Sequence, residues 1–99
     1  MTQEFKETLY TLSMNKVYVV LGIFNTEFDS DITLEVFANR IAAENFFNNC
    51  IAAEMESDWF KELPNLTIET VENILWCVYQ NDNPENYSKY SILEERVHR

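Results

Sequence analysis

The alternation of hydrophobic and polar positions predicts an antiparallel hairpin early in the chain. β-Branched and aromatic residues dominate Val17 to Phe24, which is typical of a strand. The polar stretch Asn25 to Asp31 follows, and Ile32 to Phe37 is strand-like again. Because the connection between the two is short, the strands are expected to pair in opposite directions.

A helix is predicted next, over Arg40 to Met55. Asn39 precedes it, and asparagine is a favourable N-cap because its side chain accepts hydrogen bonds from free backbone N–H groups. Hydrophobic residues then recur at helical spacing and form one stripe: Ala43, Phe46, Phe47, Cys50, Ile51, Ala53 and Met55. Residues 57–65 are interpreted as a loop, from which Trp59 and Phe60 fold back onto the core.

A second hairpin is predicted in the last third of the chain. Leu66 to Gln80 is strand-like but interrupted near Glu72 and Asn73, where we expect a bulge or bend. Residues 81–86 form a cluster of turn-favouring types. Tyr87 to Val97 is expected to be the final strand.

Together these elements predict an α+β fold in the order β-β-α-β-β. The fold consists of a four-stranded antiparallel sheet, one main helix packed on one face, and a short N-terminal helix or arm. Phe5, Leu9 and Leu12 have the spacing of a short amphipathic helix. Residues 1–13 are therefore interpreted as an appendage, and residues 14–99 as a single α+β domain.

Two of the predicted strands are hydrophobic on both sides, although a sheet with one solvated face should alternate. One helix covers only one face of a four-stranded sheet. The other face is expected to be covered by residues 1–13, by a second copy or by a partner. We favour a homodimer, because aromatic residues dominate such interfaces and this chain offers three candidates: Tyr18, Trp76 and Tyr79.

The chain is strongly acidic. It has 99 residues, with 17 acidic and 7 basic side chains and a formal net charge of −10. Small soluble domains usually carry about 2–8 net charges. Such a field attracts basic surfaces, and scattered cations cannot follow a phosphate backbone, so direct nucleic-acid binding is not expected. Neither a membrane span nor a secretion signal is recognisable, which favours a cytoplasmic protein that binds no membrane.

Three carboxylates stand two positions apart in the polar stretch of the first hairpin, at Glu27, Asp29 and Asp31. This spacing resembles a calcium loop, which would also need a glycine and a glutamate where Ile32 and Ala38 stand. A solvated hairpin loop is therefore the better interpretation, and no metal site is expected. A hairpin tip can enter a groove, so these carboxylates are candidates for contact with a basic partner.

Catalytic chemistry finds little support. The single histidine, His98, stands next to the chain end, where a general base would be poorly positioned. Cys50 and Cys77 lie in hydrophobic patterns and are interpreted as buried thiols. Gly22 stands alone, so there is no glycine-rich phosphate loop. We expect neither an enzyme nor a cofactor.

From Lys16 onward the chain resembles short proteins of bacteriophages and mobile elements. The resemblance is carried by KVYVVLGIF, by NTEFDSD, by LEVF with the following ANRIAAENFFNNC, and by YSKYSILEERV, and it covers about 80 residues. Acidic proteins of this kind often inhibit host machinery, including restriction and CRISPR systems. Because the group shares no motif, the resemblance assigns no role to any residue.

The leading hypothesis is a phage-encoded inhibitor or adaptor that binds a host defence protein, in the manner of an anti-CRISPR protein. Its carboxylates would stand in for phosphates against a surface rich in lysine and arginine. One alternative is an accessory domain that mainly self-associates. Another is a protein that sequesters a small nucleotide, although an anionic ligand needs cations that are scarce here.

Overall fold

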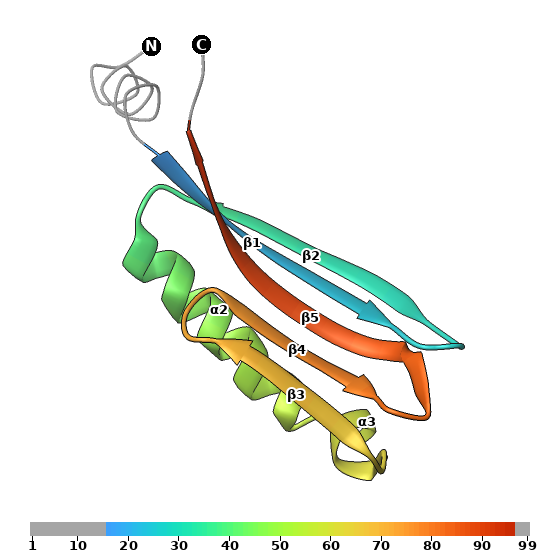
Figure 1. The fold of residues 1–99 in the computed structure, drawn as a ribbon. Coiled ribbons are helices and arrows are strands. Elements are labelled where there is room, and N and C mark those ends of the chain that lie inside the picture. Colours follow the sequence, from blue (N-terminus) through green and yellow to red (C-terminus); the bar gives the residue numbers. More distant parts are fainter. Residues whose placement is uncertain (1–15, 97–99) are drawn as a thin grey trace, which may run out of the picture.

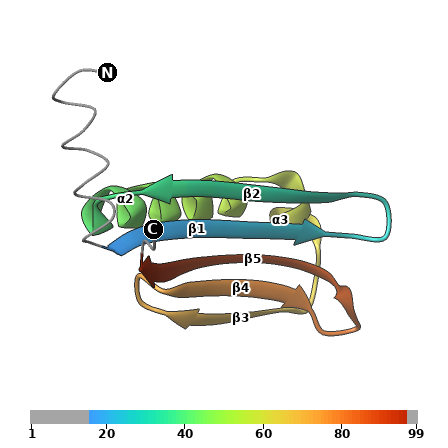
Figure 2. The ribbon, with the colours of Figure 1, turned by 90° about the horizontal axis from the view of Figure 1, so that it is seen from above.

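The computed structural model describes residues 16–96, so the appendage 1–13, His98 and the end of the last predicted strand lie outside the described residues. Five strands form one antiparallel sheet in the order β2-β1-β5-β4-β3 (Figures 1 and 2). The elements along the chain are β1 (Lys16–Asn25), β2 (Ser30–Phe37), α2 (Arg40–Met55), α3 (Asp58–Glu62), β3 (Leu66–Val71), β4 (Leu75–Gln80) and β5 (Asn83–Arg96). The predicted α+β class and the first hairpin are confirmed.

The prediction of four strands was wrong, because Leu66 to Gln80 forms two strands and not one interrupted strand. The expected bulge is a hairpin turn, closed by a hydrogen bond of 3.0 Å from the Ile74 N–H to the Val71 carbonyl. Asn73 adopts a left-handed backbone conformation with φ of 55°. Asparagine tolerates this conformation, so the chain reverses direction here without a glycine.

The long strand β5 joins the two halves of the sheet. One side of it pairs with β1 from Lys16↔Arg96 to Asn25↔Tyr87, and the other side pairs with β4. The start of β1 and the end of β5 therefore lie side by side at one end of the sheet. The β1–β2 turn and the β4–β5 turn lie at the opposite end (Figure 1).

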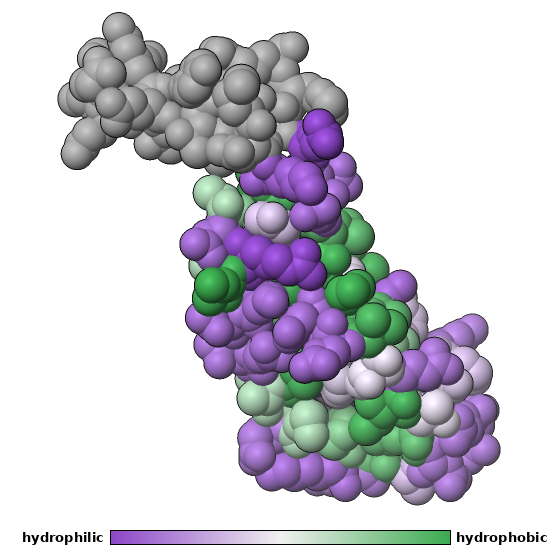
Figure 3. All heavy atoms as spheres, turned by 60° about the vertical axis from the view of Figure 1, so that its left-hand side comes forward, coloured by the Kyte–Doolittle hydropathy of each residue, from purple (hydrophilic) through white to green (hydrophobic). Residues whose placement is uncertain are grey.

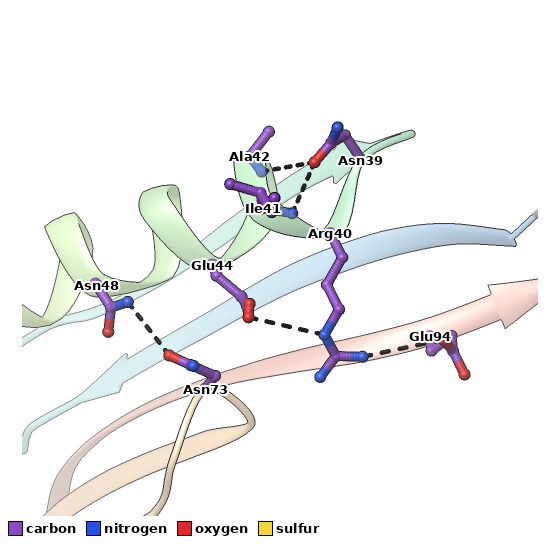
Figure 4. A network of polar contacts seen from close by, with 8 residues as sticks. All are labelled: Asn39, Arg40, Ile41, Ala42, Glu44, Asn48, Asn73 and Glu94. Atoms are coloured by element: carbon purple, nitrogen blue, oxygen red, sulfur yellow. Dashed lines mark hydrogen bonds and ion pairs between the residues drawn. The ribbon is translucent and has the colours of Figure 1, made fainter.

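Helix α2 begins where the sequence predicts it. The Oδ1 atom of Asn39 accepts hydrogen bonds from the N–H groups of Ile41 (2.7 Å) and Ala42 (3.2 Å), which are otherwise free at a helix start (Figure 4). The guanidinium of Arg40 lies 3.8 Å from the Glu44 carboxylate and 4.0 Å from that of Glu94 on β5. These contacts fix the first turn of α2 and place it over the sheet.

The hydrophobic core lies between the two helices and one face of the sheet, called here the covered face. Its buried members are Val20, Ala43, Phe47, Trp76, Val78 and Ile92. Trp59 and Phe60 pack against them as expected, but residues 58–62 form the short helix α3 and not the predicted loop. The ring centroids of Trp59 and Phe60 lie 6.4 Å apart. The core is therefore built by alternate residues of β1, β4 and β5 and by one side of α2.

Candidate functional site

Seven exposed carboxylates gather at the end of the sheet that carries the β1–β2 and β4–β5 turns. This acidic end includes the three residues singled out in the sequence and four that are distant from them along the chain. Its members are Glu27, Asp29, Asp31, Asp58, Glu62, Asp82 and Glu85. These residues come from the β1–β2 turn, from α3 and from the β4–β5 turn with the start of β5. Antiparallel pairing of β1 with β5 and of β3 with β4 brings these three segments to the same end of the sheet.

Hydrogen bonds hold the segments of the acidic end together. The side-chain amide of Asn25 donates to the carbonyl of Glu85 at 2.8 Å, and the N–H of Glu27 donates to Asn86 Oδ1 at 3.3 Å. The amide of Asn65 donates to a carboxylate oxygen of Asp82 at 3.1 Å. The β1–β2 turn and the β4–β5 turn therefore form one connected surface.

The β1–β2 turn also has internal support. The N–H of Thr26 donates to the carbonyl of Asp29 at 2.8 Å, which closes the turn. The Thr26 hydroxyl oxygen accepts from the N–H groups of Phe28 (3.3 Å) and Asp29 (3.1 Å). The backbone that carries Glu27 and Asp29 is therefore ordered without a partner.

Basic side chains are distributed unequally over the described residues. Two basic residues lie toward the acidic end: Lys61, whose ammonium is 2.9 Å from the carboxylate of Glu56, and Lys89, which pairs with Ile23 two positions from the end of the β1–β5 register. Lys16 and Arg40 both contact Glu94 toward the opposite end, where Arg96 pairs with Lys16 in the β1–β5 register. The negative charge of the chain is consequently least compensated at the acidic end.

A pocket of about 390 Å³ opens within the acidic end, between the β1–β2 turn and α3. Trp59 and Phe24 form part of its wall, with ring centroids 5.4 Å apart in an edge-to-face arrangement. Phe28 also lines the pocket, and its side chain is 91% exposed. The described residues that line it are Phe24, Thr26, Glu27, Phe28, Asp29, Trp59, Glu62, Leu63 and Asn86.

A second pocket of about 450 Å³ lies between α2 and the β3–β4 turn. Its lining includes Phe47, Ile51, Met55, Glu72 and Asn73. Among the residues that the structure describes, no lysine, arginine or histidine lines this pocket or the one at the acidic end. Both therefore lack the cations that a phosphate-bearing ligand needs, so they give no support to nucleotide sequestration.

The sheet face opposite the helices, called here the open face, carries a continuous aliphatic surface on its β2–β1 half. Because side chains alternate along a strand, the neighbours of buried Val20 point to this face, and the β1–β2 register places β2 residues beside them. Ile32 and Leu34 are 70% and 59% exposed. We define the aliphatic patch as Val17, Val19, Leu21, Ile23, Ile32, Leu34, Val36 and Leu93.

The side of the molecule that carries α2 has a different surface. Figure 3 brings forward the side on which α2 lies in Figure 1, and hydrophilic residues there separate several smaller hydrophobic patches. Asn45, Asn48 and Asn49 are exposed on α2. Of these two surfaces, the open face with its eight-residue aliphatic patch is therefore the better candidate for a binding surface.

The three aromatic residues predicted for one interface lie on two different faces. Trp76 is 5% exposed and belongs to the core, and Tyr18 packs against that core, with the Arg40 guanidinium 5.7 Å from its ring centre. Tyr79 follows Val78 in β4 and therefore lies on the open face, where its hydroxyl donates to Glu69 at 3.3 Å. Trp76 cannot be an interface anchor, because α2 and α3 already cover it.

Sequence reasoning missed the aliphatic residues of β2, whose alternation with Thr33 and Glu35 is the signal that identifies them.

The two cysteines are unpaired and half-buried, which corrects the prediction that both are buried. Cys50 lies on α2, and Cys77 lies on the open face beside Lys89 of β5. Burial raises the pKa of both thiols, assisted at Cys50 by Glu35 and Glu54; at Cys77 the ammonium of Lys89 acts in the opposite direction and Glu69 adds to the rise. We therefore expect both thiols to be protonated at neutral pH and to react slowly with a thiol reagent.

A polar cluster lies beneath α2, where Gly22 makes room for a tyrosine. The Ser88 hydroxyl donates to the carboxylate of Glu54. A Cβ atom at Gly22 would stand 2.4 Å from the Tyr90 ring, so only glycine allows the ring to lie over β1. Burial raises the pKa of Tyr90 to about 12, with further contributions from Glu54, Cys50 and Asp31.

The raised pKa of Tyr90 predicts a loss of stability at alkaline pH. The folded protein favours the neutral phenol, so this contribution is complete below the unfolded pKa of about 10 and is lost as pH rises through about 12. Urea unfolding should therefore show a smaller decrease in stability from about pH 8 to about pH 11 in Tyr90→Phe than in the wild type. Tyr79→Phe is the control, and an equal decrease in all three proteins contradicts the prediction.

The described residues contain no group of three or more histidine, cysteine or acidic side chains arranged to hold a metal ion. No helix among them is long and apolar enough to cross a membrane. Comparisons with protein-family models, curated proteins and solved structures give no match. The features of the described residues that bear on function are the acidic end, its pocket and the aliphatic patch.

Proposed function

We propose that this chain is a small acidic binding protein whose acidic end docks onto a basic surface of another protein. The observation that carries the proposal is the gathering of seven exposed carboxylates from the β1–β2 turn, α3 and the β4–β5 region, against two nearby lysines, Lys61 and Lys89. Charge complementarity of this kind accelerates association and disfavours wrong partners. The ordered β1–β2 turn reduces the entropy lost on binding.

The resemblance to short bacteriophage proteins suggests the class of partner. A host defence protein that binds DNA or RNA must expose lysine and arginine, and exposed carboxylates can occupy that surface in place of phosphates. We therefore propose an inhibitor of such a protein, acting by occupation of its nucleic-acid surface and not by catalysis.

The test compares two variants of equal charge. The partner is first captured from host lysate with the wild-type chain and then purified. Glu27→Lys, Glu62→Lys and Glu85→Lys are combined in one variant, and Glu69→Lys, Glu72→Lys and Glu95→Lys in the control. Each set changes the net charge by +6, from −10 to −4. The first set lies in the acidic end, and within residues 16–96 its side chains accept no hydrogen bond from another residue.

We expect the acidic-end variant to bind the partner at least about tenfold more weakly, while the control loses much less, because interaction between charges falls off within about one Debye length. The wild-type affinity should also fall between low and physiological salt. Equal loss in both variants would mean that net charge alone matters, and unchanged affinity in both would exclude the acidic end as the binding device.

The aliphatic patch favours a second function, self-association. Contiguous apolar patches on the surface of a small protein mark interaction sites when they are large. β2 is an edge strand, and its row of exposed Ile32, Leu34 and Val36 is continuous with the β1 row across the register Ile23↔Ile32, Leu21↔Leu34 and Val19↔Val36. We propose that two copies join through this patch, which leaves both acidic ends free for partners.

A further inference from the structure

The pocket of the acidic end combines aromatic walls with a carboxylate rim. Phe24, Phe28 and Trp59 supply the aromatic surface, and Leu63 adds an aliphatic side. Glu27, Asp29 and Glu62 also line the pocket. Its volume of about 390 Å³ lies within the range of about 300–1,000 Å³ usual for ligand pockets.

This composition selects for an organic cation. The face of an aromatic ring carries partial negative charge and attracts cations. Carboxylates at the rim attract the same charge and repel phosphates and other carboxylates. An uncharged apolar group would gain from the rings but would leave the rim carboxylates without a counter-charge.

Among cationic protein side chains, arginine matches the pocket better than lysine. Its guanidinium is planar, stacks on aromatic rings and forms paired hydrogen bonds with carboxylates. Its hydration is also weaker than that of an ammonium, so entry into a partly apolar pocket costs less. The chain provides both types of contact in one place, because the β1–β2 turn and α3 face each other across the pocket.

We propose that this pocket binds an arginine side chain of the partner protein, stacked against the aromatic wall and paired with the rim carboxylates. The inference rests on the proposed function, since it names the residue through which the acidic end recognises a basic surface. The walls exist before binding: the Asn86 amide is 8% exposed, accepts from the Glu27 N–H and donates to Gln80 Oε1 at 2.9 Å.

Titration with Nα-acetyl-arginine methylamide, followed by nuclear magnetic resonance, tests the proposal directly. We expect saturable shifts of the backbone amides of residues 26–29 and of the Trp59 indole N–H, but not of the Trp76 indole. The Trp59 N–H is a suitable reporter because it is buried without an acceptor among the described residues. The citrulline derivative has nearly the same shape without the charge and should bind much more weakly.

Two pairs of variants complete the experiment. Phe28→Ala removes a 91% exposed ring, so it should preserve the fold. It should lower the affinity for the arginine derivative by about two- to fivefold, as expected for one exposed cation–π contact. Ile41→Ala is its control, because Ile41 is 69% exposed on α2 and belongs to neither the pocket nor the aliphatic patch. Glu62→Gln should also weaken binding, whereas Glu72→Gln, outside the pocket, should not.

The proposal is overturned if the arginine derivative leaves the pocket signals unchanged, if citrulline binds equally well, if lysine binds more tightly, or if Phe28→Ala has no effect. These results are separable from the proposed function. If the arginine derivative does not bind but the affinity for the partner still depends on the acidic end, only the assignment of arginine to the pocket is rejected. If the pocket binds the arginine derivative but the affinity for the partner does not depend on the acidic end, the proposed function is rejected, and with it the origin of the arginine in that partner, whereas the preference of the pocket for arginine stands.

Discussion

Phe47→Ala is expected to lower the free energy of unfolding by about 3–5 kcal/mol, a range typical for removal of a buried aromatic ring. Phe47 is 2% exposed and lies on α2 against the covered face of the sheet. Its loss removes contacts with the core and leaves a cavity that rigid strands cannot fill. Small domains are stable by only about 5–15 kcal/mol, so a large part of the stability should disappear.

Urea denaturation measures this effect, and Phe28→Ala is a control with the same chemical change. Phe28 is 91% exposed, so its removal should change stability by less than about 0.5 kcal/mol. A loss of less than about 1 kcal/mol in Phe47→Ala would contradict the placement of α2, because that is the size of a partly buried contact. The pair therefore tests the helix–sheet packing independently of any partner.

The sequence predicts those parts of the fold that depend on neighbouring residues. The limits of α2 follow from the Asn39 cap and from the helical stripe. The first hairpin follows from two hydrophobic runs around a polar turn. The β3–β4 hairpin was missed because its turn contains neither glycine nor proline, and Asn73 supplies the left-handed conformation that glycine usually provides.

The candidate site depends on contacts between distant residues, which the sequence does not determine. Glu27 and Glu62 belong to one site only because α3 folds against the end of β1 and β2, and strand order places the β4–β5 turn beside them. The sequence does show that β1 and β4 are hydrophobic on both sides. It does not show which side α2 covers, and for that reason Trp76 was assigned to the interface although it belongs to the core.

The aliphatic patch predicts that the purified protein is a dimer at micromolar concentration and that Leu34→Glu converts it to a monomer. Leu34 is 59% exposed and pairs with Leu21 near the centre of the patch. A carboxylate there would be buried against aliphatic side chains of the second copy, which is costly without a counter-charge. Light scattering measures the change as a halving of the molar mass.

Ile68→Glu is the matched control, because Ile68 is also an exposed aliphatic residue of an edge strand but lies on the other face, opposite Val78 in the register. It should leave the dimer intact. A wild-type chain that is monomeric, and remains so after residues 1–13 are removed, contradicts self-association and also a role for that segment in covering the patch.

Added salt is expected to have opposite effects on the affinities of the two proposed interfaces. Each copy carries a net charge of −10, so two copies repel each other, and the dimer must be held by apolar contact. Screening reduces that repulsion, and the dimer should become tighter as salt increases. Binding of a basic partner to the acidic end relies on attraction, and it should become weaker over the same range. If dimerisation also weakened with salt, charge pairing and not the aliphatic patch would join the copies, and Leu34→Glu would then leave the mass unchanged.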